Sequence, residues 1–181
     1  FADIERYPEL GETFAQRNQL LINDGTRFRD VSDGAGEGLQ IARVGRGLAV
    51  GDLDNDGDLD IVVSNMDAEP TVLENRPVSP RHWVGFRIAG PAPNPFAIGA
   101  KVTIDAGGRR QMREIRSGGS YLSQSDLRAH FGLGDHAGPV SVEVRMPGGA
   151  TWRWSDLAVD RVHVLELTPQ RRMTSSAPQD R

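Results

Sequence analysis

The stretch Gly45-Arg-Gly-Leu-Ala-Val-Gly-Asp-Leu-Asp-Asn-Asp-Gly-Asp-Leu-Asp-Ile-Val-Val-Ser-Asn65 decides the fold of the first part of this chain. Two apolar segments, Gly47–Val50 and Ile61–Ser64, flank a run in which aspartate occupies every second position from Asp52 to Asp60. Short segments rich in valine and isoleucine, bounded by turn residues, are typical of strands. The stretch therefore predicts a β-hairpin with an acidic loop.

Five carboxylates so close together repel one another, and a divalent cation removes that repulsion. Ca²⁺ prefers six to eight oxygen ligands in a flexible arrangement, and alternate positions of a tightly turned loop can converge on it. Gly57, at the sixth position, permits the sharp turn. The predicted ligands are the carboxylates of Asp52, Asp54, Asp56 and Asp60, together with the main-chain carbonyl of Asp58.

The residues around this loop distinguish it from an EF-hand. An EF-hand carries a bidentate glutamate at the twelfth position and a helix on either side, whereas here the twelfth position is Val63 and strands are expected on both sides. The sequence therefore predicts a calcium loop on a β-hairpin. The alternative is an acidic, solvated turn without an ion.

A second hairpin is expected before this one. Gln19–Ile22 and Thr26–Val31 are predicted as its strands, joined by the turn Asn23–Gly25. Thr71–Asn75 resembles Gln19–Asn23, and a spacing of about 50 residues is typical of a four-stranded propeller blade. The first part of the chain is therefore predicted to be a propeller-type repeat.

Pro77 and Pro80 mark the expected domain boundary, because two prolines in four residues interrupt a β-ladder and stiffen a linker. Residues 1–76 are assigned to the repeat with an N-terminal arm, residues 82–168 to a second domain and residues 169–181 to a mobile tail. Arg109–Arg116 is expected to be an edge strand or a solvent-facing strand of the second domain, since its arginines discourage edge pairing. The other expected strands there are His82–Ile88, Ile98–Ala106, Val140–Met146, Thr151–Trp154 and Arg161–Thr168, the last covered on both faces.

The composition excludes several classes of protein and several kinds of site. With 21 basic and 25 acidic residues the net charge is −4, which excludes a generally basic nucleic-acid binder. The chain has no cysteine, which excludes disulfides, a thiolate nucleophile and a zinc site of the cysteine type. No apolar run approaches the roughly 18 residues of a membrane span. Phe1 is not an initiator methionine, so we expect a mature product or an excised piece.

These residues also carry a family resemblance. Asn18–Gly25, Phe28–Ser32 and Gly45–Asn65 resemble an FG-GAP/VCBS-type repeat of integrin-like propellers. The second part is similar to the ASPIC/UnbV domain, and the combination resembles the C-terminal part of the secreted, cartilage acidic protein-like family. The second-domain motifs are Ile98-Gly-Ala-Lys-Val102, Gly118-Gly-Ser-Tyr-Leu-Ser-Gln-Ser-Asp126 and His130-Phe-Gly-Leu-Gly134.

The resemblance implies calcium at Asp52, Asp54, Asp56 and Asp60, with the carbonyl of Asp58, and it implies no enzymatic activity. It also implies an all-β fold, in which a propeller-type repeat precedes a β-sandwich-like ASPIC/UnbV domain. Because a closed propeller needs several blades, we expect the chain to be the C-terminal part of a longer secreted protein.

Other candidate sites have simpler interpretations. Ser123, Asp126 and His130 lie close in sequence and suggest the nucleophile, orienting acid and base of a hydrolase. No strained nucleophile turn such as Gly-x-Ser-x-Gly accompanies them, so hydrogen bonding within a loop rich in glycine and serine is the expected role. Trp152 and Trp154 are predicted core residues, with a sugar-binding platform as the alternative. Residues expected to be solvated or structural rather than functional are His82, His136, His163, Arg109, Arg110, Arg113 and Arg116.

The sequence therefore predicts a non-catalytic, calcium-binding extracellular or periplasmic module that binds a protein or glycan, or other blades of the same protein. The alternative is an accessory protein or enzyme acting on a glycan or a secondary metabolite through the C-terminal domain.

Overall fold

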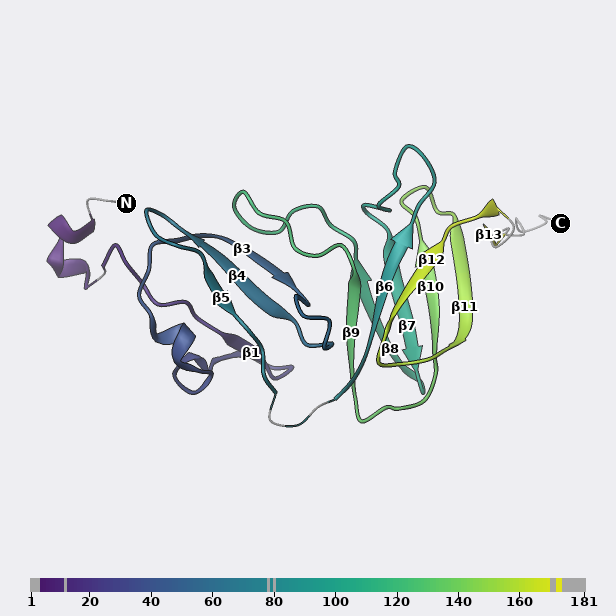
Figure 1. Cartoon of the computed structure of the whole chain (residues 1–181), viewed down its shortest axis with the longest axis horizontal. Coiled ribbons are helices and arrows are strands. Elements are labelled where there is room, and N and C mark those ends of the chain that lie inside the picture. The colour runs from purple at the N-terminus through teal and green to yellow at the C-terminus, as the bar shows by residue number, and fades with distance from the viewer. Residues whose placement is uncertain (1–3, 12, 78, 80, 170–171, 174–181) are drawn as a thin grey trace. The chain divides into compact units, whose positions relative to one another are not determined.

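The computed structural model describes residues 4–11, 13–77, 79, 81–169 and 172–173. Over these residues the protein is all-β, as predicted, and its helices are four single 3₁₀ turns (Figure 1). Two compact units are found. Unit 1 comprises residues 1–51, 59–75 and 119–124, and unit 2 comprises residues 52–58, 76–118 and 125–181.

Unit 1 contains the two predicted hairpins. Strands β1 (Leu21–Asn23) and β2 (Phe28–Asp30) pair antiparallel. Strands β3 (Gly45–Gly51), β4 (Asp60–Asn65) and β5 (Thr71–Leu73) form an antiparallel sheet in that order. The 3₁₀ turns of this unit are η1 (Ile4–Arg6), η2 (Pro8–Leu10), η3 (Ser32–Gly34) and η4 (Glu37–Gln40).

Side chains of the β1–β2 turn hold that hairpin closed. The Asp24 carboxylate accepts hydrogen bonds from the hydroxyl of Thr26 at 2.6 Å and from the main-chain N–H groups of Thr26 and Arg27, both at 3.0 Å. Asn23 accepts a further bond from the N–H of Gly25 at 2.9 Å. Aspartate and asparagine favour turns because they can bond their own backbone in this way.

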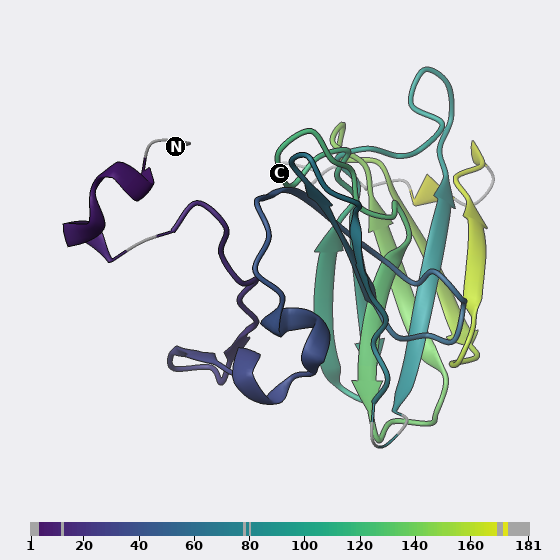
Figure 2. The same ribbon diagram turned by 60° about the vertical axis from the view of Figure 1, so that its left-hand side comes forward.

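Unit 2 is a sandwich of two sheets, shown from two directions in Figures 1 and 2. A five-stranded sheet has the order β13-β11-β10-β7-β8, and a three-stranded sheet has the order β12-β6-β9. Arginine-rich β8 lies at an edge, as predicted. The strands are β6 (His82–Ala89), β7 (Lys101–Ala106), β8 (Arg109–Glu114), β9 (Ala129–Gly134), β10 (Val140–Arg145), β11 (Thr151–Leu157), β12 (Val162–Glu166) and β13 (Arg172–Met173).

The core of unit 2 lies between these sheets. Phe86 of β6 and Phe131 of β9 are fully buried and meet edge to face, with ring centroids 6.0 Å apart. Ile104 and Val144 face them from the five-stranded sheet and are also fully buried. Apolar residues alternate with polar ones along β7 and β10, so one face of each strand is buried, as its period of two predicts.

Three expectations differ from the structure. Strand β12 is an edge strand, with Val164 60% exposed, so it is not covered on both faces. Strand β9 was not predicted as a strand. Arg172–Met173 of the expected mobile tail pair with β11 as strand β13. Residues 78, 80, 170–171 and 174–181, which include Pro80 of the expected linker, lie outside the described residues.

Candidate functional site

The acidic loop joins β3 to β4, where Gly51 pairs with Asp60. This pairing brings the two ends of the loop together, so Asp52 and Asp60 become neighbours although seven residues separate them in sequence. Inside the loop, the N–H of Asp56 donates to the Asp54 carboxylate at 3.3 Å, and the N–H of Asp58 donates to the Asp56 carboxylate at 2.9 Å. These bonds wind the loop tightly.

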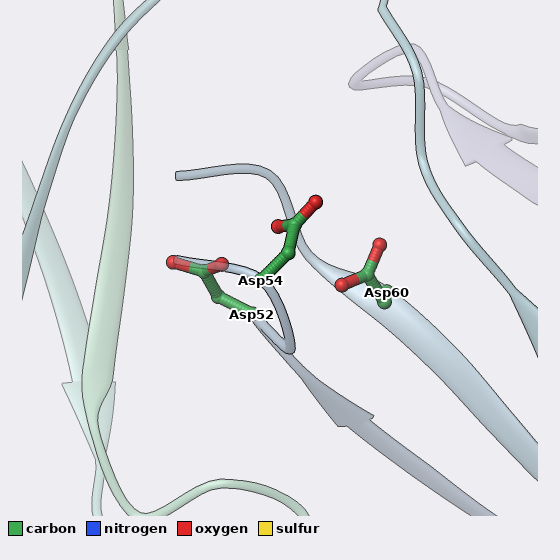
Figure 3. A group of neighbouring side chains, drawn as sticks. All are labelled: Asp52, Asp54 and Asp60. Atoms are coloured by element: carbon green, nitrogen blue, oxygen red, sulfur yellow. The ribbon is translucent and has the colours of Figure 1, made fainter. Parts of the chain in front are cut away.

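Three of the predicted ligands converge. Asp52, Asp54 and Asp60 each offer one carboxylate oxygen, and these oxygens lie within 4.8 Å of one another. Figure 3 shows that Asp52 and Asp54 come from the loop, whereas Asp60 begins β4. Asp52 is 6% exposed and Asp60 is 3% exposed, while Asp54 is open to solvent. The group could therefore hold a cation through two buried oxygens and one accessible oxygen.

The two buried carboxylates differ in their hydrogen bonds. Asp60 accepts a bond from the main-chain N–H of Asn75 at 2.9 Å. Both carboxylate oxygens of Asp52 are buried, and neither has a hydrogen-bond partner within the described part of the chain. A buried carboxylate without a partner costs several kcal/mol, because the protein does not replace the water it has lost. A bound cation would remove that cost.

Asp56 and Asp58 were predicted as further ligands. The Asp56 side chain is exposed and accepts the N–H of Asp58, so it caps the loop turn. Among the described residues, neither of these two belongs to the converging group. Participation of Asp56 and of the Asp58 carbonyl stays a prediction.

The three residues that suggested a hydrolase have separate partners. The Ser123 hydroxyl donates to the carbonyl of Leu48 at 2.8 Å, Asp126 accepts from Arg128, and the ring of His130 bonds the carbonyl of Gly57 at 2.7 Å. A catalytic triad requires these groups to bond one another. The structure does not bring them together in that way.

The remaining candidates have structural roles. Trp152 is 5% exposed and donates its indole N–H to the carbonyl of Thr168 at 2.7 Å, while Trp154 packs against the same core. Both positions agree with the core interpretation. The side chains of His82, His136 and His163 bond Asp160, the Pro139 carbonyl and the Ala158 carbonyl, respectively.

Sequence reasoning missed the contacts that hold the loop. The Arg128 guanidinium donates to the carbonyl of Asp52 at 2.7 Å and to the side-chain oxygen of Asn55 at 2.9 Å. Arg128 follows Asn55 by 73 positions, and no spacing rule connects the two. Only the folding of unit 2, which contains both residues, places them together.

Comparison with known proteins defines the class. Residues 11–63 match the family model of the FG-GAP-like repeat, and residues 90–172 match that of ASPIC and UnbV. The chain is thus an all-β protein in which an FG-GAP-like repeat precedes an ASPIC and UnbV domain, the combination that the sequence predicted.

Two curated relatives match most of the chain. Cartilage acidic protein 1 of Mus musculus is 33% identical over 151 residues, which cover 79% of this chain and 23% of that protein. Cartilage acidic protein 1 of Xenopus tropicalis is 33% identical over 142 residues, covering 75% of this chain and 22% of that protein. The chain therefore spans less than a quarter of the length of these relatives. Among its described residues, no helix has the length and apolar character to cross a membrane.

Proposed function

We propose that the chain is a non-catalytic binding module of an extracellular protein, and that Ca²⁺ bound by the loop Asp52–Asp60 holds the repeat in its folded form. The observation that carries the proposal is Asp52, whose buried carboxylate lies beside those of Asp54 and Asp60 and has no hydrogen-bond partner among the described residues. An oxygen-only donor set on a flexible loop favours a hard cation such as Ca²⁺.

The proposed extracellular location rests on the expected calcium affinity of the loop and on the similarity to known proteins. Extracellular calcium modules function with dissociation constants of about 10⁻⁴–10⁻³ M, so a site with few converging carboxylates would be occupied outside cells. The similarity to cartilage acidic protein 1 and the FG-GAP-like repeat support the same location. A protein or glycan is the proposed partner class, and the FG-GAP-like repeat supports a protein-binding role.

Thermal unfolding in Ca²⁺ and in EGTA tests whether calcium binding stabilises the folded protein. At a calcium concentration of about 100 times Kd, binding stabilises the folded state by about 2.7 kcal/mol, which raises Tm by several degrees. Asp54→Asn is expected to remove most of this shift. Asp33→Asn is the matched control, because Asp33 is 90% exposed and belongs to an exposed ion pair with Arg17.

Two outcomes of this experiment would contradict calcium binding by the loop. Equal Tm values for the wild type in Ca²⁺ and EGTA, together with no heat of binding in calorimetry, would overturn the proposal. An equal loss of the shift in Asp33→Asn would show that general negative charge, rather than the loop, attracts the ion.

A further inference from the structure

Arg128 is held against the first half of the acidic loop by hydrogen bonds to three residues. Asp126 fixes it twice, by accepting the Arg128 main-chain N–H at 2.9 Å and by pairing with the side-chain Nε. The side chains of Asp126 and Arg128 are 29% and 22% exposed, respectively. The two terminal nitrogens of the guanidinium then donate to the Asp52 carbonyl at 2.7 Å and to Asn55 Oδ1 at 2.9 Å.

His130 and Trp83 hold the second half of the loop. His130 Nε2 lies 2.7 Å from the Gly57 carbonyl, and since a carbonyl only accepts, Nε2 carries the hydrogen. The His130 ring stacks on Trp83, with centroids 5.6 Å apart and planes 15° from parallel. Gly57 lies so close to this indole that an added Cβ would meet Trp83 Nε1 at 1.9 Å.

These contacts hold the loop through the main-chain carbonyls of Asp52 and Gly57 and through the side chain of Asn55. Arg128 meets Asp52 through the main-chain oxygen, while both carboxylate oxygens of Asp52 stay without a hydrogen-bond partner within the described residues. The arginine therefore does not occupy the place of a cation. It bonds the carbonyl that precedes Leu53 and the side chain of Asn55, which follows Asp54, and so limits the positions open to the Asp52 and Asp54 carboxylates.

We infer that Arg128, assisted by His130, is a positioning residue for calcium: it holds the loop in its binding form before the ion arrives and thereby raises calcium affinity. The inference rests on the proposed function, since it concerns the same ion. Its physical basis is preorganisation, because a loop that is already ordered loses less conformational entropy on binding. Removing groups that orient metal ligands typically weakens metal binding by 10- to 100-fold.

The charge of Arg128 gives a competing expectation of opposite sign. A guanidinium near a cation site repels the ion, so an arginine acting only through its charge would weaken calcium binding, and its removal would strengthen it. Lysine separates the two effects, because it keeps the charge but loses the planar fork that reaches two acceptors. Positioning predicts weaker binding for Arg128→Lys as well as for Arg128→Ala.

The experiment measures calcium affinity by titration calorimetry on the whole chain, and Tm in Ca²⁺ and in EGTA. We expect Arg128→Ala and Arg128→Lys each to weaken affinity by roughly tenfold. Both should lower the calcium-dependent rise in Tm, a quantity that a merely structural role would leave unchanged. Arg116→Ala is the matched control, because Arg116 is 70% exposed and pairs with Glu114.

A second variant keeps the test decisive if the Arg128 variants do not fold. His130→Phe retains the stacking on Trp83 but removes the donor to Gly57, and we expect it to weaken calcium binding several-fold. Unchanged or tighter binding in folded Arg128 or His130 variants would overturn the inference while leaving the calcium site intact. A wild type that binds no calcium would instead overturn the proposed function, and the inference with it.

Discussion

Gly57 and Trp83 are in direct contact within unit 2: a Cβ built on Gly57 would lie 1.9 Å from the indole nitrogen and 2.1 Å from its neighbouring ring carbon. Gly57 also has a φ of +98°, a conformation that side chains rarely adopt. The glycine of the acidic loop is therefore required twice, by the turn of the backbone and by the aromatic ring packed on it. The second requirement belongs to the tertiary structure alone.

Replacement of Gly57 by alanine is expected to lower the free energy of unfolding by more than the backbone strain alone, which is about 1–2 kcal/mol. The excess arises because Trp83 must move. Gly108→Ala is the matched control, since Gly108 has a φ of +91° and nothing within 4 Å of its would-be Cβ. Urea unfolding in EGTA measures both. Equal losses in the two variants would contradict the role of Trp83.

Magnesium is expected to replace calcium poorly. Mg²⁺ demands near-ideal octahedral geometry at about 2.0–2.1 Å and gives up its water reluctantly, whereas the converging oxygens come from an exposed Asp54 and two buried aspartates. Millimolar Mg²⁺ should therefore raise Tm much less than millimolar Ca²⁺. Equal shifts with the two ions would indicate a general attraction of divalent cations to the acidic loop.

Truncation of Val142 tests the sandwich core. Val142 is 2% exposed and pairs with Ile104 on β7 and Trp154 on β11. Val142→Ala should lower the free energy of unfolding by about 1–3 kcal/mol, because it removes buried methyl groups and leaves a cavity. Ser141→Ala, at the exposed neighbouring position, should change it by no more than about 0.5 kcal/mol.

Asp24 gives a prediction about pH. The hydroxyl of Thr26, followed by the N–H groups of Thr26 and Arg27, holds the pKa of the Asp24 carboxyl below its usual value of 3.8. Since the folded pKa is lower than the unfolded one, ionised Asp24 stabilises the β1–β2 hairpin above about pH 4. This contribution is lost as pH falls through the folded pKa.

Carboxyl chemical shifts followed by NMR during an acid titration measure this effect. Thr26→Ala should raise the pKa of Asp24 toward its usual value. The same variant should leave Asp30 unchanged, because the lowered pKa of Asp30 depends first on the hydroxyl of Ser32. A parallel rise at both aspartates would point to general loosening of the hairpin instead.

Local sequence was sufficient for the elements that depend on neighbouring residues. Period-two alternation identified the buried faces of β7 and β10, turn residues identified the β1–β2 hairpin, and alternate aspartates identified the loop between β3 and β4. The local sequence did not predict strand β9, because its sequence Ala-His-Phe-Gly-Leu-Gly contains two glycines, which are depleted in strands. Its pairing with β6 overrides that weak local preference.

The chemistry of the acidic loop follows from its sequence, since aspartates at alternate positions of a tight turn supply the oxygens that a hard cation prefers. The tertiary structure decided which of them converge: the pairing of Gly51 with Asp60 brings Asp60 to Asp52 and Asp54, while Asp56 bonds the loop itself. It also decided that Arg128 holds the carbonyl of Asp52. The physical reason is the separation along the sequence over which each interaction acts. Turns and periodicity depend on a few neighbouring residues, whereas burial and long-range hydrogen bonds exist only once distant segments have packed together.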